Sequence, residues 1–103
     1  MDKKKDFRAI VSEMINLYDH KNSDYGNSFS ETIQEFGFIP AVARINDKVK
    51  RMKNIVKGKE MNIKDESFRD ALIDTANYCV LTLVELDNQH IESARNDEIY
   101  KYV

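Results

Sequence analysis

The stretch ESFRDALIDTANYCVLTLVEL, residues 66–86, decides the fold, because its apolar residues recur at the spacing of a long helix. Asp65 is the expected cap of this helix. The residues that share the predicted core face are Phe68, Leu72, Thr75, Cys79, Leu83 and Leu86. Between Tyr78 and Val84 the sequence is hydrophobic nearly all round, and we therefore expect this part of the helix to be buried.

Four polar residues on this helix form a stripe, which we name the acidic stripe. They are Glu66, Asp70, Asp74 and Asn77, and at about 100° per residue they lie within about 80° of one another. Like charges four residues apart destabilise a helix by a few tenths of a kcal/mol. The pattern therefore predicts a cationic partner in the folded protein.

The other segments also indicate helices. We expect helices over residues 4–20, from Ser28 or Ser30 to Phe36, from Pro40 to Gly58 and, weakly, over residues 91–102, with a polar turn from Lys21 to Gly26. Gly37 suits the left-handed residue that follows a helix end. The predicted fold is all-α, a small antiparallel bundle of four or five helices.

The predicted helix that begins near Pro40 offers cations to the acidic stripe. Its core seam is expected at Ile45, Val49, Met52 and Val56. Arg44, Lys48 and Arg51 form a second stripe beside that seam. Half-buried carboxylates need charge partners, and either these cations or a hard divalent cation such as Mg²⁺ could serve.

Composition limits the function classes. A chain of 103 residues, 42% hydrophobic and 33% charged, is expected to form one domain over residues 1–103, to be cytoplasmic and to self-associate as a dimer or tetramer. Its net charge of −2 disfavours bulk nucleic-acid binding, and no membrane segment is expected. The single cysteine, Cys79, is expected to fill the core.

The motifs leave several interpretations open. Carboxylates can hold Mg²⁺ while Arg and Lys neutralise phosphates, but the same pattern is typical of helices joined by salt bridges or of a solvated acidic face. No Gly-rich phosphate loop or triad of nucleophile and base is visible, so an enzyme of this kind would use metal-bound water. Glu31 and Glu35 could add carboxylates, whereas His20 and His90 lack partners at metal-ligand spacing.

The motifs also resemble a known family when taken in order. They are Lys21-Asn22-Ser23-Asp24-Tyr25-Gly26, then Arg44 with Lys48 and Arg51, then Glu66-Ser67, Asp70, Asp74 and Asn77-Tyr78. Over residues 7–86 this pattern resembles the nucleotide modification associated domain 1 family, found largely in phages and in bacteria carrying prophages. If the protein is phage-encoded, the expected location is the host cytoplasm. More distantly it is similar to all-α nucleoside triphosphate pyrophosphohydrolases of the MazG and dUTPase type, although the acids are spaced by four here rather than three.

This resemblance implies a nucleotide-handling protein of nucleotide metabolism or DNA modification. The implied metal-binding and catalytic residues are Glu66, Asp70 and Asp74, with Mg²⁺ as the cofactor. The implied substrate-binding residues are Lys21, Asp24, Tyr25, Arg44, Lys48, Arg51, Asn77 and Tyr78. Among them, the lysines and arginines would hold phosphates, and Tyr25 or Tyr78 would contact the base or sugar. Two alternatives stay open, namely a non-catalytic protein that sequesters a nucleotide against host defence and a helical interaction module.

Overall fold

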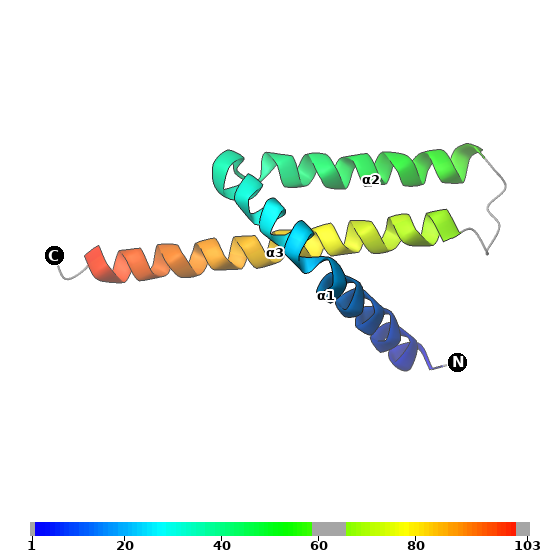
Figure 1. Cartoon of the computed structure of the whole chain (residues 1–103), viewed down its shortest axis with the longest axis horizontal. Coiled ribbons are helices and arrows are strands. Elements are labelled where there is room, and N and C mark those ends of the chain that lie inside the picture. Colours follow the sequence, from blue (N-terminus) through cyan, green and yellow to red (C-terminus); the bar gives the residue numbers. More distant parts are fainter. Residues whose placement is uncertain (1, 59–65, 101–103) are drawn as a thin grey trace.

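The chain folds into three helices and no strands within the part that the structure describes (Figure 1). The structure is a computed structural model that describes residues 2–58 and 66–100, with side chains at 2–20, 27–58 and 67–89. The helices are α1 (Lys3–Phe36), α2 (Ile39–Gly58) and α3 (Glu66–Tyr100). The predicted all-α class is therefore confirmed. Residues 59–65, which include the predicted cap Asp65, lie outside the described residues.

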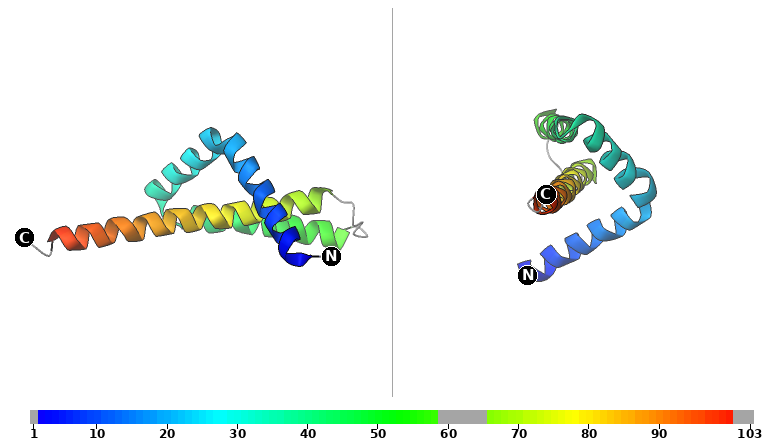
Figure 2. Two further views of the ribbon diagram at one scale, coloured as in Figure 1. Left: turned by 90° about the horizontal axis from the view of Figure 1, so that it is seen from below. Right: turned by 90° about the vertical axis from the view of Figure 1, so that its left-hand side faces the viewer.

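The helix count is lower than the predicted four or five, because predicted neighbours are joined. The segment 21–26 is helical rather than a turn, and Figure 2 shows that α1 bends between its two halves instead of ending there. Likewise α3 continues through the predicted break to Tyr100. Asn, Ser, Asp and Gly are weak helix breakers whose preference is routinely overridden, and Gly and Ser are typical of helix bends.

The helix ends that the sequence predicted near residue 37 and residue 58 are confirmed. Asp2 caps the start of α1, where its side chain accepts hydrogen bonds from the backbone N–H of Lys4 at 3.1 Å and of Lys5 at 3.3 Å. Gly37 follows the end of α1 with φ +79°, and its N–H donates to the carbonyl of Ile33 at 2.8 Å. Pro40 lies in the first turn of α2, and α2 ends at Gly58.

The core is a small cluster where the second half of α1 and the start of α2 meet the middle of α3. Its buried members are Phe29, Ile33, Ala41, Tyr78 and Leu81, with Phe38 and Ile45 packed against them. Figure 1 shows α2 and α3 side by side, running in opposite directions. The first half of α1 crosses α3 and leaves Phe7 70% exposed and Ile15 54% exposed.

The predicted core face of α3 is wrong at four of its six residues, whereas Phe68 and Thr75 are half-buried. Leu72, Leu83 and Leu86 are 46%, 56% and 38% exposed, and Cys79 is exposed rather than core filling. The buried residues on α3 are instead Ala71, Ile73, Tyr78 and Leu81. The face that meets α2 is thus turned by about 100° from the predicted one. A helix that is hydrophobic all round gives no periodic signal that selects between its faces.

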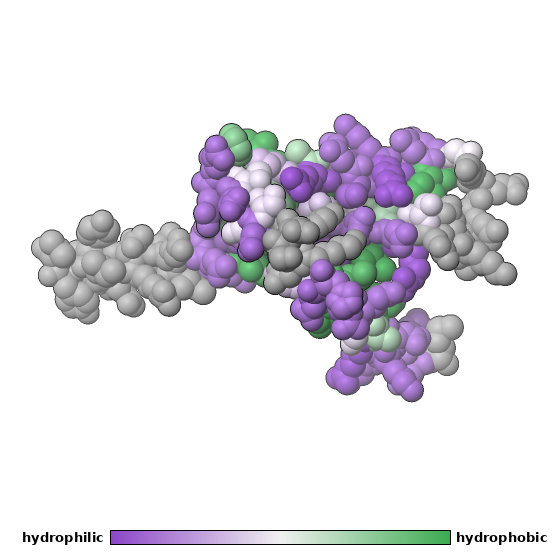
Figure 3. Space-filling model, in the orientation of Figure 1, coloured by the Kyte–Doolittle hydropathy of each residue, from purple (hydrophilic) through white to green (hydrophobic). Residues whose placement is uncertain are grey.

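The seam predicted on α2 is partly correct. Ile45, Val49 and Met52 are half-buried, whereas Val56 is 49% exposed. Figure 3 shows apolar side chains reaching the surface between hydrophilic ones. None of the described helices is sufficiently long and apolar to cross a membrane.

Candidate functional site

The predicted cationic stripe of α2 lines a surface hollow between α2 and α3, which we name the cationic hollow. It has a volume of about 370 Å³ and is lined by Arg44, Asp47, Lys48, Arg51 and Tyr78. Residues at these spacings share one helix face, so α2 itself aligns the three cations. The structure thus brings together Arg44, Lys48, Arg51 and Tyr78, which the sequence had proposed as binding residues.

A second hollow adjoins the first towards the end of α2. It has a volume of about 550 Å³, shares Asp47 and Arg51 with the cationic hollow, and is also lined by Lys50, Asn54, Ile55, Gly58 and Ser67. Arg51 therefore lies where the two hollows meet. A ligand longer than one phosphate group could extend from one into the other.

Arg44 is held by Tyr78 from the facing helix. Its Nη1 donates a hydrogen bond to the Tyr78 hydroxyl at 3.5 Å, and its guanidinium carbon lies 5.8 Å from the centre of the tyrosine ring. The Tyr78 ring is in turn 5.8 Å from the ring of Phe29, at an angle of 48°. Because Tyr78 is 5% exposed, its ring belongs to the core and is unsuited to stacking on a base.

Lys48 and Asp74 form the second link between the two helices. The Lys48 Nζ lies 3.5 Å from Asp74 Oδ2, and the two side chains are 26% and 35% exposed. Asp74 is therefore a half-buried carboxylate with a cationic partner, as the sequence predicted for the acidic stripe. Three cations face two carboxylates here, Asp47 and Asp74, which leaves a local excess of positive charge.

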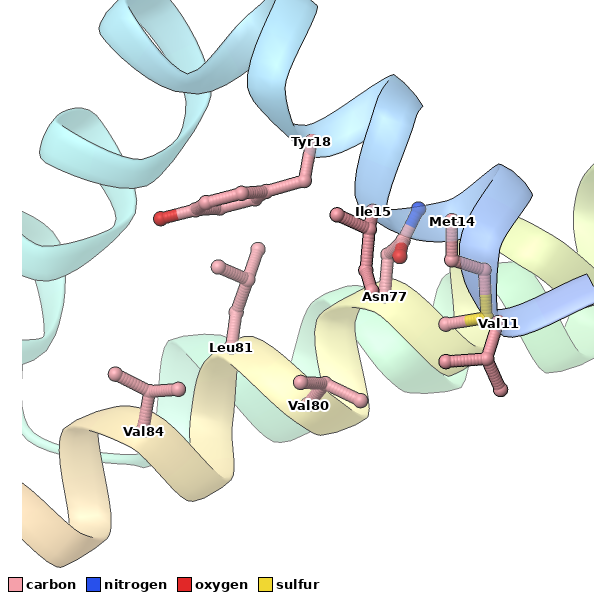
Figure 4. A pocket seen from close by; sticks show the side chains of 8 residues that line it. All are labelled: Val11, Met14, Ile15, Tyr18, Asn77, Val80, Leu81 and Val84. Carbon is pink, nitrogen blue, oxygen red and sulfur yellow. The ribbon is translucent and has the colours of Figure 1, made fainter. Parts of the chain in front are cut away.

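Asn77 is only about 60° from Asp74 around α3, but it faces α1 whereas Asp74 contacts α2. It lines an apolar groove of about 250 Å³ between α1 and α3 (Figure 4). In Figure 4, Asn77 and Leu81 point from α3 towards α1, where Ile15 and Tyr18 lie. The structure therefore does not bring Asn77 to the cationic hollow.

The described side chains of the acidic stripe do not form a metal site. Asp70 is exposed on α3, and the side chain of Glu66 lies outside the described residues. Among the described side chains, no group of three or more His, Cys, Asp and Glu could hold a metal ion. Asp70 lines neither hollow, and Asp74 is paired with Lys48.

The remaining predicted residues belong to α1. Lys21, Asp24 and Tyr25 lie on the helical backbone of α1, but their side chains lie outside the described residues. Glu31 and Glu35 are exposed and line neither hollow.

Sequence reasoning did not identify Asp47 or Phe29 as part of the site. Asp47 lines both hollows, and its position three residues after Arg44 and four before Arg51 is a signal that could have found it. Phe29 supports the ring of Tyr78, a contact between distant segments for which helical spacing carries no signal.

The geometry defines a class, a small all-helical protein with a cationic surface site at the junction of two helices. A family model described as nucleotide modification associated domain 1 matches residues 21–86, and the chain belongs to this family. Every residue that lines the cationic hollow falls within this match. No curated protein and no solved structure matches the chain.

Proposed function

We propose that this protein binds nucleotides, and that the cationic hollow holds their phosphates. The observation that carries the proposal is the convergence of Arg44, Lys48 and Arg51 on one hollow. Arginine guanidinium groups match the geometry of phosphate oxygens, and lysine adds a flexible point charge. The family description, nucleotide modification associated, supports a nucleotide as the phosphate carrier.

The neighbouring side chains support the same assignment. Tyr78 holds Arg44 over the hollow, so that part of the side-chain ordering is already achieved before ligand binds. Arg51, at the meeting of the two hollows, suits a chain of phosphates that runs from one into the other. We place the protein in phage or prophage nucleotide metabolism or DNA modification as part of this proposal.

Calorimetric titration with nucleoside mono-, di- and triphosphates, canonical and modified, tests the binding. Arg51→Ala should weaken triphosphate binding by roughly tenfold or more, since a hydrogen bond to a charged group is worth about 1.5 to 3 kcal/mol. Lys53→Ala is the matched control, because it removes an exposed cation of α2 that lines neither hollow. Equal loss in both variants, or no binding by the wild type, would contradict the proposal.

A reaction is the next step of the proposal. Water would attack the α-phosphorus of a nucleoside triphosphate, the bond to the bridging oxygen would break, and the nucleoside monophosphate and pyrophosphate would leave. Asp70 or Asp74 would accept the proton of the water, while Arg44, Lys48 and Arg51 stabilise the phosphate charge. Mg²⁺, when bound, would supply further charge neutralisation at the phosphates, with Glu66 as a third carboxylate.

A non-catalytic role is the second candidate, and the ion pair of Lys48 with Asp74 favours it. A carboxylate already paired with lysine is less available to a metal or to water. Sequestration predicts tight binding without release of pyrophosphate, and Asp70→Asn should then leave affinity unchanged. If neither binding nor turnover is found, the ion pairs between helices favour a helical interaction module instead.

Self-association belongs to the proposal as well. Among the described side chains, seven apolar residues are buried, whereas many large ones, including Phe7, Ile39 and Leu83, are well exposed. A chain of this kind gains stability when a second surface covers its exposed apolar side chains.

A further inference from the structure

The helix α3 has an apolar face that no other part of the described chain covers. Asp74 and Tyr78 contact α2, and Val80 and Val84 line the groove beside α1. On the remaining side lie Leu72, Cys79, Leu83 and Leu86, which we name the α3 stripe. They fall within about 60° of one another, and the three leucines are 46%, 56% and 38% exposed.

The whole chain exposes more surface than a folded monomer of its mass. Its accessible surface is 8554 Å², whereas about 6000 Å² is expected for 12.0 kDa. Its radius of gyration is 17.5 Å, against about 13 Å for a compact domain of this length. A stable interface takes roughly 800 Å² from each partner, and on the described part of α3 the three exposed leucines supply apolar area for it.

We propose that the protein is a homodimer in which α3 of one copy packs antiparallel against α3 of a second copy along the α3 stripe. The stripe complements itself, as an interface on a two-fold axis requires. Its middle residue is Cys79, equally far from Leu72 and Leu86. In the antiparallel pair, Leu72 of one copy therefore meets Leu86 of the other, and the two Cys79 side chains meet at the axis.

Charge selects the antiparallel direction. Arg69 and Asp87 are exposed and lie on the same edge of α3, because 18 residues make about five full helical turns. An antiparallel pair brings Arg69 of one copy near Asp87 of the other, whereas a parallel pair keeps the two about 27 Å apart along the helix axis. Arg69 keeps 54% of its side chain exposed while it binds Glu13, so it has room for this second contact.

This inference does not depend on nucleotide binding, because the cationic hollow lies on the α2 side of α3. A second copy is favoured over an unrelated partner by the self-complementary leucines and the matching charges at the two ends of the stripe. A different protein would have to supply the same pattern.

Sedimentation and cross-linking of the full chain test the dimer. Wild-type protein should have twice the mass of the 12.0 kDa chain, with a melting temperature that rises with protein concentration. Cys79 is the only cysteine, so a short bismaleimide should give a covalent dimer through Cys79 alone. Cys79→Ser should give none.

Two further variants test the face and the direction. Leu83→Asp should weaken the dimer by roughly a hundredfold or more, because a buried unpaired carboxylate is strongly unfavourable, while Val42→Asp on α2 should not. In the Cys79→Ser background, chains with Leu72→Cys should cross-link to chains with Leu86→Cys when the two are mixed. Chains with Leu72→Cys alone should not cross-link to each other, since antiparallel packing separates the two Leu72 positions by about 21 Å.

Three results would overturn the inference. These are a wild-type monomer whose melting temperature is independent of concentration, a dimer that Leu83→Asp leaves equally tight, and a dimer in which Cys79 does not cross-link. Should Leu83→Asp fail to fold, the wild-type mass and the cross-links still decide.

Discussion

The ammonium group of Lys48 lies 3.5 Å from the Oδ2 atom of Asp74 and joins α2 to α3 beside the cationic hollow. Both side chains are about one-quarter to one-third exposed, at 26% and 35%. A pair so open to solvent stabilises the fold by no more than about 1 kcal/mol. Its main interest is chemical, because it holds a carboxylate in contact with a cation of the proposed phosphate site.

Asp74→Asn should separate binding from turnover. The substitution removes the negative charge but keeps the size of the side chain, so we expect Mg²⁺-dependent turnover to be lost while Mg²⁺-free nucleotide binding is retained. Stability should fall by less than about 1 kcal/mol. Pyrophosphate release and calorimetric titration measure the two effects.

The matched control for this prediction is Asp87→Asn, which neutralises an exposed carboxylate farther along α3. It should leave turnover and nucleotide binding unchanged. Unchanged turnover in Asp74→Asn, or loss of Mg²⁺-free binding, would contradict the role proposed for Asp74.

Tyr78→Phe should weaken nucleotide binding without unfolding the protein. The ring keeps its contact with Phe29, but the hydroxyl that accepts from Arg44 is lost. Affinity should therefore fall by about two- to tenfold as Arg44 becomes less ordered, and stability by about 1 kcal/mol. Calorimetric titration and urea unfolding measure the two, and Tyr18→Phe, in the groove beside α1, should leave affinity unchanged.

Gly37→Ala and Gly58→Ala should change stability in opposite directions. Gly37 has φ +79° and ψ −158°, a conformation that other residues adopt at a free-energy cost of about 1 to 3 kcal/mol. Gly58 is helical, has no positive φ, and has nothing within 4 Å of an added Cβ, so alanine there should stabilise by about 0.5 to 1 kcal/mol. Equal effects in urea unfolding would show that backbone conformation does not set the difference.

Much of the helical pattern could be predicted from the sequence, because caps and glycines act locally. Gly37 and Gly58 mark ends of helices that the structure confirms. The polar segment 21–26 misled the prediction, since it bends α1 without ending it. Local preferences of that kind are small compared with the packing that fixes Phe29 and Ile33 in the core.

The candidate site could likewise be predicted only in part. The alignment of Arg44, Lys48 and Arg51 follows from helical spacing, and so could be predicted. The side of α3 that faces the core could not be predicted, because apolar residues surround this helix. Packing alone selects Tyr78 and Leu81 for the core. The stripe with Leu72 and Leu83, predicted as core, is left exposed in the single chain, and this is the face that the proposed dimer would bury.

The ion pair between Glu13 and Arg69 should make stability depend on pH in the acid range. Arg69 Nη2 lies 2.6 Å from Glu13 Oε2, and Nη1 lies 3.1 Å from Oε1. The hydrogen bond from Arg69, together with its positive charge, holds the pKa of Glu13 below its ordinary value of 4.5, although burial acts in the opposite direction. Because the folded pKa is lowered, this contribution is fully present above about pH 4.5 and is lost as pH falls through the lower, folded value.

Arg69→Ala should therefore raise the pKa of Glu13 towards 4.5 and remove the part of the acid sensitivity that this pair supplies. The titration of the Glu13 carboxyl carbon by NMR measures the pKa directly, and urea unfolding at several pH values measures the linked stability. Arg8→Ala removes an exposed arginine that lies on α1, like Glu13 itself, and should leave the Glu13 titration unchanged. A Glu13 pKa that is the same in wild type and Arg69→Ala would show that the two side chains are not paired in solution, and α1 would then lack its ion-pair link to the start of α3.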